Sequence, residues 1–487
     1  MKTKSILFIL ILVVFYSCSD KKKQEIEGEI NAIENNLLPA IQIKDEPVKK
    51  YTIAERMEHY KVPGISIAVV KDGELHWAKG YGIANTNDSS EVTTNTLFQA
   101  GSISKPIAAF AALKLVEEGK IDLDEDVNTY LKDWKIPDNK FTETEKVTLR
   151  RLLTHTAGMT VHGFPGYQQK DTFPSIKTVL NGKGNTTAIV VDTFPGSIWR
   201  YSGGGFTVME KLVEDVSGLP LEKYMAKNIL PQMGMLNSTY EQPLPETLYS
   251  KASAAYNGKG EIIEGLWHNY PEQAAAGLWT TPSDLANYCL NVQNLLSGKE
   301  KGVLSKEIIE KMLTKHKNDW GLGVSLQGVG DSLIFSHGGK NEGFTNNLIS
   351  FAHHGDAVII MTNADNGGAL INEILRSISS YYGLEISNQK VIEVIKIPVD
   401  QLNKLTGKYK LNFQIPGIGD YFIEMRIKDS SLTVNDLITK QVSKLYPLQE
   451  LKFIDIESGE EVQFQKSGDS DKIGLIWNNQ YPFSKID

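Results

Sequence analysis

The chain has little cysteine and no excess of basic charge, and both shortages exclude classes of protein. Its 487 residues include only two cysteines, Cys18 and Cys289, too few for a disulfide framework or a zinc site built on cysteine. Acidic residues outnumber basic ones by 59 to 51, and the net charge of −8 argues against nucleic acid as a partner, because phosphate binding needs a basic face. Hydrophobic residues at 41% and charged residues at 23% are close to globular averages, so we expect a folded chain of about three domains.

The first segment has the pattern of an export signal. Lys2 and Lys4 precede an apolar run over residues 6–16, which is too short to cross a bilayer as a helix and has the length of a signal-peptide core. The run ends at Ser17 and Cys18, and this ending resembles the lipobox of bacterial lipoproteins, in which the cysteine becomes the lipidated first residue. An ordinary cleaved signal with an incidental cysteine is the alternative.

The lipobox resemblance implies export to the bacterial cell envelope, with a lipid anchor at Cys18 on the periplasmic or outer face of a membrane. We expect residues 1–18 to be the signal, and residues 19–48, rich in Lys, Glu, Asn and Asp, to be a tether with one short helix. Cys289 then lacks a partner and is expected to be a small buried hydrophobe.

The middle of the chain alternates strand and helix patterns. Residues 65–78 predict a β-hairpin around the turn Lys71–Gly73, and residues 102–118 predict a helix that ends at Gly119. Residues 120–270 are a mixed stretch of short helices and turns. Further strands are predicted at 323–327, 332–336, 347–352 and 357–362, and further helices at 283–296 and 369–382.

The last part of the chain has a different pattern. Residues 386–399, with Pro398, are predicted to be a linker, and residues 400–487 an all-β module built as a small barrel or sandwich. The short alternating strands expected there are 409–413, 421–427, 431–434, 451–454 and 461–465.

Ser102 and Lys105 are the first residues with a chemical pattern. They occur in the sequence FQAGSISK (98–105), three residues apart at the start of the predicted helix, which puts them on one face a turn apart. The helix N-terminus favours an alkoxide and offers backbone N–H groups, and a desolvated Lys amine can act as a base. Alone, Ser-x-x-Lys is weak, since a capping Ser with a solvated Lys gives the same pattern.

Two further segments supply the groups that a Ser-x-x-Lys enzyme needs. Residues 195–206 (PGSIWRYSGGGF) place Tyr201 in a Gly-rich loop before a helix, and residues 335–343 (FSHGGKNEG) place His337 at a strand end with two glycines. Three such elements in this order are a stronger signal than any one of them.

These motifs resemble those of the serine β-lactamases and penicillin-recognising enzymes, most closely the branch of AmpC-type enzymes, D,D-carboxypeptidases, D-aminopeptidases and related esterases. The similarity covers roughly residues 50–385 and includes VPG (62–64), LLTHTAGM (152–159) and AGLWTTPSDLA (276–286). It implies an α/β fold, with a β-lactamase/transpeptidase-like antiparallel sheet flanked by helices over 49–385 and a helical insert at 101–270. The last ninety residues resemble the lipocalin-like, barrel-like modules appended to such hydrolases.

The resemblance also implies roles for single residues. Ser102 would be the acylated nucleophile, Lys105 its base or proton shuttle, and Tyr201 the group that activates Ser102 and protonates the leaving group. His337 would occupy the Lys position of the family's Lys-Thr-Gly strand, and the backbone N–H groups of Ser102 and Lys340 would form the oxyanion hole. No metal or cofactor is implied.

Two positions depart from the family pattern. The Tyr motif usually ends in Asn, but the residue here is Gly203, and the strand motif reads His337-Gly338-Gly339, so an imidazole with an ordinary pKa of about 6.5 replaces a permanent ammonium. Gly203, Gly338 and Gly339 are the expected substrate-binding positions. Both changes point away from an efficient β-lactamase and resemble esterase and D-aminopeptidase members with His at that place.

Other motifs receive structural interpretations. The literal Lys466-Ser467-Gly468 leaves too little chain after it for the fold's remaining strands and helix, and His155, within LLTHTAGM, is assigned a buried hydrogen-bonding role. Glycines 203–205 are not followed by the Lys of a phosphate loop, and a Gly-x-Ser-x-Gly elbow is absent from the sequence.

The sequence therefore predicts a metal-independent serine hydrolase. It would form an acyl-enzyme on Ser102 and cleave a small-molecule ester, or an amide of the D-amino-acid or cell-wall peptide type. The alternative is a catalytically weak or inactive penicillin-binding-like protein of the envelope, which Gly203 and His337 favour and which the retained Ser102, Lys105 and Tyr201 oppose.

Overall fold

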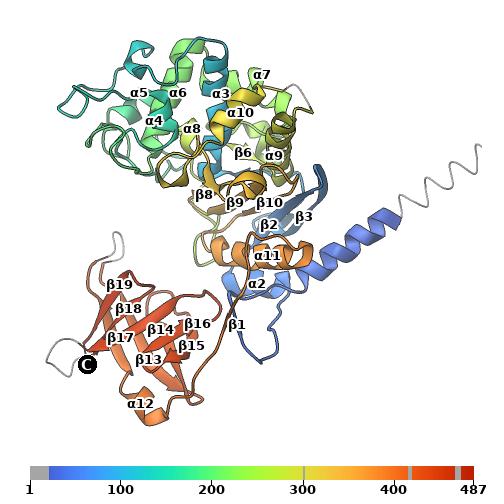
Figure 1. Ribbon diagram of the computed structural model, residues 1–487, viewed down its shortest axis with the longest axis vertical. Helices are drawn as coiled ribbons and strands as arrows, with labels where there is room; N and C mark the ends of the chain where they lie inside the picture. Colours follow the sequence, from blue (N-terminus) through green and yellow to red (C-terminus); the bar gives the residue numbers. More distant parts are fainter. Residues whose placement is uncertain (1–20, 300–301, 415–418, 467–472, 487) are drawn as a thin grey trace, which may run out of the picture. The chain divides into compact units, whose positions relative to one another are not determined.

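The chain divides into two compact units in the computed structural model, which describes residues 21–299, 302–414, 419–466 and 473–486 (Figure 1). One unit is Arg56–Ile371, and the other combines Met1–Glu55 with Asn372–Asp487. The predicted signal at 1–18, with Cys18, lies outside the described residues. Within the described ranges, the helices are all too short or too polar to cross a membrane.

A seven-stranded antiparallel sheet forms the base of the first unit. Its order is β4 (Ser90–Glu91), β3 (Glu74–Asn85), β2 (Gly64–Lys71), β10 (Ala357–Thr362), β9 (Phe344–Phe351), β8 (Ile334–Asn341) and β7 (Ser325–Gln327). The central strands β2 and β10 are runs of Ile, Val and Ala that are buried along almost their whole length, as expected of strands covered on both faces. The predicted hairpin is confirmed as β2–β3, and β8 and β9 extend further than their patterns indicated.

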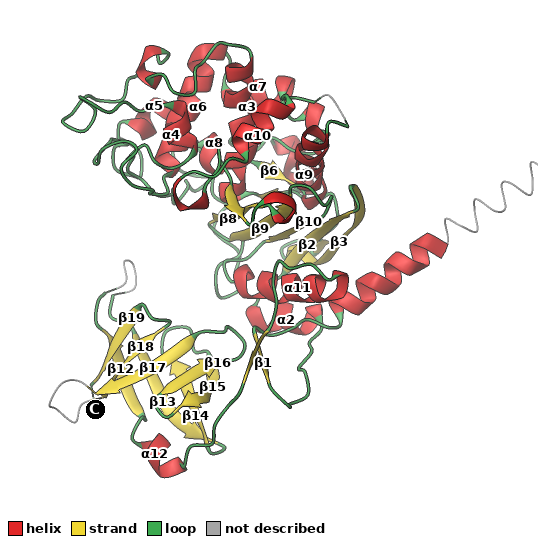
Figure 2. Cartoon of the chain, viewed as in Figure 1, coloured by secondary structure: helices red, strands yellow, loops and turns green. Residues whose placement is uncertain are grey.

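Helices and short 3₁₀ turns (η) make up the rest of this unit. Figure 2 shows most of them gathered on one side of strands β8–β10. They are η1 (Gly101–Ile103), α3 (Ser104–Glu117), η2 (Val127–Thr129), α4 (Leu149–Leu153), α5 (Ile176–Leu180), α6 (Gly203–Ser217), α7 (Leu221–Asn228), η3 (Pro231–Met233), η4 (Glu246–Lys251), α8 (Gln273–Ala276), α9 (Pro282–Ser297), α10 (Lys306–Met312), η5 (Lys317–Asp319) and η6 (Gly330–Ser332), with the two-residue strands β5 (Phe98–Gln99) and β6 (Trp279–Thr280) paired among them.

Two helix starts differ from the sequence prediction. Ser102 does not open the α-helix: it lies in η1, and α3 begins two residues later at Ser104. The glycines 203–205, predicted to form a loop, are the first turn of α6, because the Ser202 Oγ accepts a hydrogen bond from the Gly205 N–H at 2.9 Å and caps the helix ahead of them.

The second unit contains a closed eight-stranded antiparallel barrel, which confirms the predicted all-β module as a barrel. Its strands are β12 (Gly407–Leu411), β13 (Phe422–Lys428), β14 (Ser431–Asp436), β15 (Val442–Gln449), β16 (Lys452–Asp455), β17 (Glu461–Lys466), β18 (Ile473–Trp477) and β19 (Tyr481–Lys485), closed by the pairing of β12 with β19. The sequence patterns had indicated five of these and missed β15, β18 and β19. Lys466 ends β17, while Ser467 and Gly468 lie outside the described residues.

Parts of the predicted tether and of the predicted linker form regular secondary structure in the second unit. Residues 21–34 are helical, and β1 (Ile41–Ile43), within the predicted tether, pairs in parallel with β11 (Lys390–Ile392), within the predicted linker. Their isoleucines form a small apolar cluster with Ile454 and Ile456 of the barrel, which explains why these stretches are ordered. The remaining helices are α2 (Ile53–Tyr60) and α11 (Gly367–Tyr382), which span the boundaries of the two units, and α12 (Val399–Asn403) before the barrel.

Candidate active site

Ser102 and Lys105 are joined by a hydrogen bond at the start of α3. The Lys105 Nζ donates to the Ser102 Oγ at 2.9 Å and to the backbone carbonyl of Ala275 at 2.8 Å. Ser102 is half-buried, whereas the Lys105 side chain is almost fully buried, with the residue 2% exposed. The Ser102 hydroxyl is therefore partly accessible to a substrate, whereas the Lys105 amine is not.

The environment of Lys105 favours a neutral amine. No ion pair joins it to a carboxylate in the described part of the chain, and burial lowers its pKa to about 7. The Nζ lies 5.0 Å from the centre of the Tyr201 ring and 5.8 Å from that of Phe206, so within the described ranges these two aromatic rings and the two hydrogen bonds compensate the charge of a protonated amine. A buried Lys with a pKa near neutrality can accept a proton from the hydroxyl next to it.

Tyr201 lies directly before the cap of α6, and its phenol faces the same pair. Burial raises the pKa of the Tyr201 hydroxyl well above its ordinary value, and the Ser102 hydroxyl opposes part of that rise. Its Oη has no hydrogen-bond partner of normal geometry among the described side chains and backbone. A phenol that keeps its proton at neutral pH is suited to give a hydrogen bond or a proton, and less suited than Lys105 to act as the resting base.

His155 packs against the ring of Tyr201. It is 2% exposed, its Nδ1 accepts a hydrogen bond from the Ser202 N–H at 3.1 Å, and its ring centre lies 4.2 Å from that of Tyr201. The buried hydrogen-bonding role predicted for this residue is thereby confirmed. The rings of Trp199 and Trp320 also lie close to His155, with centres 6.2 and 5.0 Å away, and complete an aromatic wall that the sequence did not indicate.

His337 lies in β8 and is neutral. It is 6% exposed, and burial, aided by the nearby Lys105, lowers its pKa to about 3. Its Nδ1 lies 2.6 Å from the Gly338 carbonyl oxygen, which can only accept, so Nδ1 carries the proton and Nε2 is an acceptor without a partner in the described ranges. The sequence predicted a partial loss of positive charge here at neutral pH; the buried site makes that loss complete.

The backbone of β8 lies directly against the turn that holds Ser102. A Cβ added to Gly339 would lie 2.0 Å from the Ala100 carbonyl oxygen, and one added to Gly101, whose φ is +55°, would lie 2.5 Å from the Lys340 nitrogen. The two backbone segments therefore approach as closely as glycine allows. This places the Lys340 N–H beside the Ser102 turn, as an oxyanion hole requires, while the Lys340 side chain forms an ion pair with Asp365 at 2.7 Å.

The two remaining predicted glycine positions differ from each other. Gly338 is exposed on β8, and a Cβ there would meet only the Asn346 carbonyl oxygen, at an ordinary contact distance of 4.0 Å. Gly203 is buried in α6, where a Cβ would lie 3.0 Å from the His162 carbonyl oxygen and 3.0 Å from the Phe164 ring. Because Gly203 is buried, its placement does not support the predicted contact with substrate. An Asn side chain at this position would have to displace residues 162–164.

The side-chain amides of Gln99, Asn341 and Asn346 connect the strands of the site to its helices, and the sequence did not identify this role. Asn341 Nδ2 donates to the Gln99 Oε1 at 2.8 Å and to the Ala276 carbonyl at 3.0 Å, and Asn346 Nδ2 donates to the Gln99 carbonyl at 2.8 Å. They tie β8 and β9 to the segment that leads into Ser102 and to α8, which supplies the carbonyl that holds Lys105. Gln99 and Asn341 lie within the motif segments 98–105 and 335–343, and Asn346 follows the second segment by three residues, but the residue types alone did not indicate this role.

Among the described residues, no group of three His, Cys, Asp or Glu side chains lies close enough together to bind a metal ion. Cys289, in α9, is buried as predicted.

A helical layer that meets an antiparallel sheet at a Ser–Lys–Tyr cluster defines the class of β-lactamase-fold serine hydrolases. The family model described as Beta-lactamase matches residues 50–378, and the chain belongs to this family. The barrel lies beyond the matched residues.

The chain is similar to named relatives of the penicillin-binding type. It is 26% identical over 335 residues, 67% of this chain and 78% of the relative, to "Putative penicillin-binding protein PbpX" of Bacillus subtilis (strain 168). It is 29% identical over 230 residues, 45% of this chain and 52% of the relative, to "Putative D-alanyl-D-alanine carboxypeptidase" of Salmonella agona (strain SL483). The fold is similar to that of the octameric penicillin-binding protein homologue from Pyrococcus abyssi, with a TM-score of 0.60, 23% identity and coverage of 89% of this chain and 98% of that one.

Proposed function

We propose that this protein is a serine hydrolase that works through an acyl-enzyme on Ser102. The observation that carries the proposal is the 2.9 Å hydrogen bond from a buried Lys105, free of any carboxylate partner in the described ranges, to the half-buried Ser102 hydroxyl. Family membership supports the same chemistry. The closeness of the two groups matters first, because a base must reach the proton it removes.

The reaction follows from these positions. Neutral Lys105 takes the hydroxyl proton as Ser102 Oγ bonds to the substrate carbonyl carbon, and the N–H groups of Ser102 and Lys340 bind the resulting oxyanion. The bond to the leaving group then breaks while Tyr201 Oη–H gives that group a proton, and the Lys105 ammonium passes the proton taken from Ser102 to the Tyr201 phenolate, so both side chains return to their resting states. In the second half, neutral Lys105 takes a proton from the attacking water, the bond between the acyl carbon and Ser102 Oγ breaks, and the Lys105 ammonium returns the proton to Ser102 Oγ.

The neutral His337 restricts the substrate. A leaving group that carries a free carboxylate would find no imidazolium at this position at neutral pH, and the Lys340 ammonium is already paired with Asp365. We therefore place the substrate among esters, and among D-amino-acid or cell-wall amides whose leaving group is uncharged. The Salmonella relative is named a putative carboxypeptidase, an activity whose leaving group carries a carboxylate, and we propose a different kind of leaving group for this chain.

Intact-protein mass spectrometry tests the nucleophile. A fluorophosphonate should add once to the wild-type chain and not to Ser102→Ala, and an adduct that persists in Ser102→Ala would refute the assignment. Lys105→Ala and Tyr201→Phe should each slow acylation by about 10²- to 10⁴-fold, the usual loss for a general base or acid.

A substrate panel separates the hydrolase from the alternative of a non-catalytic binding protein. p-Nitrophenyl esters and D-alanyl p-nitroanilide should be turned over faster than nitrocefin, with turnover abolished in Ser102→Ala. A binding protein would turn over none of the three.

A further inference from the structure

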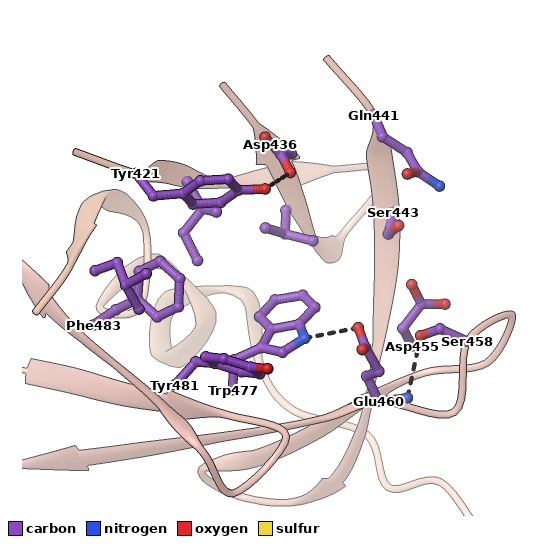
Figure 3. A pocket seen from close by; sticks show the side chains of 13 residues that line it. Tyr421, Asp436, Gln441, Ser443, Asp455, Ser458, Glu460, Trp477, Tyr481 and Phe483 are labelled. Atoms are coloured by element: carbon purple, nitrogen blue, oxygen red, sulfur yellow. Dashed lines mark hydrogen bonds between the residues drawn. The ribbon is translucent and has the colours of Figure 1, made fainter. Parts of the chain in front are cut away.

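The barrel contains a cavity that the hydrolase chemistry does not use. Its volume is about 420 Å³, and among its lining residues are Gln441, Ser458 and Tyr481, from the turns 436–442, 455–461 and 477–481 at one end of the barrel (Figure 3). Both the volume and the closed wall are those of a site for one small ligand, as in other eight-stranded barrels.

Aromatic side chains form one wall of this barrel cavity. Trp477 and Tyr481 are cross-strand neighbours at the tip of the β18–β19 hairpin, and Tyr421 and Phe483 line the cavity beside them. The Trp477 indole is fixed by a hydrogen bond from its Nε1 to Glu460 at 2.8 Å, and the Tyr421 hydroxyl donates to Asp436. These polar contacts hold the rings by their edges and leave their faces for a ligand.

The opposite wall is acidic. Asp436, Asp455 and Glu460 line the cavity, and none of the described residues that line it is basic. None of the three carboxylates forms an ion pair within the described ranges, although the chain is otherwise rich in such pairs. The basic residue in the adjoining turn, Lys440, donates instead to the Leu437 carbonyl at 2.7 Å.

The three carboxylates differ in how far their oxygens are already used. Asp436 is saturated, because it accepts from the Tyr421 hydroxyl and from the N–H groups of Ile438 and Thr439. Glu460 uses one oxygen for Trp477, and its other oxygen has no hydrogen bond from any described residue. Asp455 is 7% exposed and accepts a hydrogen bond from the Glu457 N–H at 2.8 Å, so it contributes charge rather than a free acceptor; burial raises its pKa, and a positive neighbour would stabilise its charged form.

The composition of the cavity excludes other ligand classes. An anion would meet three carboxylates without a cation, and a neutral apolar ligand would leave Glu460 and Asp455 further desolvated at a cost. A metal ion needs convergent oxygens, but the described acidic side chains nowhere gather in threes at ligand distance. Aromatic faces beside carboxylates are instead the recognised surroundings of an organic ammonium group.

We propose that the barrel cavity binds a small alkylammonium ion, primary or quaternary, whose charge lies against Glu460 and Asp455 and whose carbon groups pack on Trp477 and Tyr481. This binding is independent of the acyl-enzyme chemistry, so either proposal can fail without the other.

Titration calorimetry on the full chain tests the proposal with four probes: choline, propylammonium, the neutral choline isostere 3,3-dimethyl-1-butanol, and calcium. At least one ammonium probe should bind one to one and about tenfold or more tightly than the neutral alcohol, the factor expected for a desolvated cation–π contact with a counter-charge. Equal binding of the alcohol, Glu460-dependent binding of calcium alone, or no ammonium binding at millimolar concentration would each overturn it.

Two variants and a matched control locate the site. Glu460→Gln should weaken ammonium binding about tenfold, while Glu450→Gln, the same change on an exposed residue of the β15–β16 turn, should leave it unchanged. Trp477→Phe keeps a ring in place and should abolish the ligand-induced change in tryptophan emission, since the other six tryptophans all lie in the unit Arg56–Ile371. Unfolding midpoints equal to that of the wild type show that the variants are folded. Equal loss in Glu450→Gln, or an emission change that survives in Trp477→Phe, would contradict the assigned site.

Discussion

At the scale of single residues, the chemistry of this protein is governed by burial. Lys105 and His337 both have lowered pKa values because the site around them is dry, one to about 7 and the other to about 3. The sequence identified both residues through their motifs, since residue type and spacing are local properties. It could not give their protonation, because that depends on Trp199, Trp320 and α8, which come from other parts of the chain.

The first prediction concerns the pH dependence of acylation. The lowered pKa of Lys105 means that the neutral, competent amine predominates above about pH 7, so kcat/KM for an ester should rise with unit slope up to pH 7 and then level. At pH 5 it should be about a hundredfold below the plateau. A second protonation near 6.5 should be absent, because His337 stays neutral. A flat profile between pH 5 and 8 would remove Lys105 as the base.

The second prediction concerns the buried carboxyl group of Glu272, just before α8. It is 0% exposed, neither of its oxygens has a partner in the described ranges, and burial raises its pKa to about 8. The folded state therefore holds this proton more tightly than the unfolded chain, whose pKa is about 4.3, so stability falls as pH rises from about 4 to 8. Glu272→Gln, which cannot ionise, should be more stable than wild type at pH 9 by up to about 5 kcal/mol and similar to it at pH 4.5. Urea unfolding at both pH values measures this, and a pH-independent difference would contradict it.

At the scale of elements, the strongly periodic parts of the chain were predictable. The β2–β3 hairpin, β10 and α9 follow from hydrophobic pattern and turn residues alone. β15 was missed because it carries Pro447, which ordinarily argues against a strand. The parallel pairing of β1 with β11 could not be predicted, since each is three residues long and the two are separated by most of the chain.

The third prediction uses the neighbouring glycines of β8. Gly339→Ala puts a methyl group against the Ala100 carbonyl, where backbone faces backbone, so it should push β8 away from η1, destabilise the fold by about 1–3 kcal/mol and sharply lower the acylation rate. Gly338→Ala, the adjacent change, meets only the Asn346 carbonyl oxygen at 4.0 Å and is the control for stability, which it should retain to a first approximation. An acylation rate of Gly339→Ala equal to that of the wild type would show that the close approach of β8 to Ser102 is not needed for catalysis.

At the scale of the whole molecule, the family match and the barrel occupy different parts of the chain. Residues 50–378 carry the shared fold and the Ser–Lys–Tyr cluster, and the barrel follows with a cavity of its own. The sequence predicted both parts, because the change from mixed to purely alternating patterns marks the boundary. It did not reveal the cavity, because the rings and carboxylates that line it are spread over four strands, β14, β16, β18 and β19, and over the turns before β13 and β17.

The fourth prediction concerns where the protein resides. If Cys18 is the lipidated residue, Cys18→Ala should move the chain from the membrane fraction to the soluble fraction of an expressing bacterium and abolish labelling by a radioactive fatty acid. Cys289→Ala, which alters the buried cysteine of α9, should change neither. Membrane retention of Cys18→Ala would favour an ordinary signal and another means of attachment.

In the proposed mechanism, burial alone keeps Lys105 able to act as the base at neutral pH, since no acidic side chain in the described ranges forms an ion pair with it. If water entered the space around Lys105, the pKa of the amine would return toward its ordinary value. The amine would then be protonated at neutral pH and could not act as a base, although no reacting atom had moved. Activity in this mechanism therefore depends on the close packing around Lys105. A compound that separated the rings of Trp199 and Trp320 from Tyr201 would inhibit acylation without contacting Ser102.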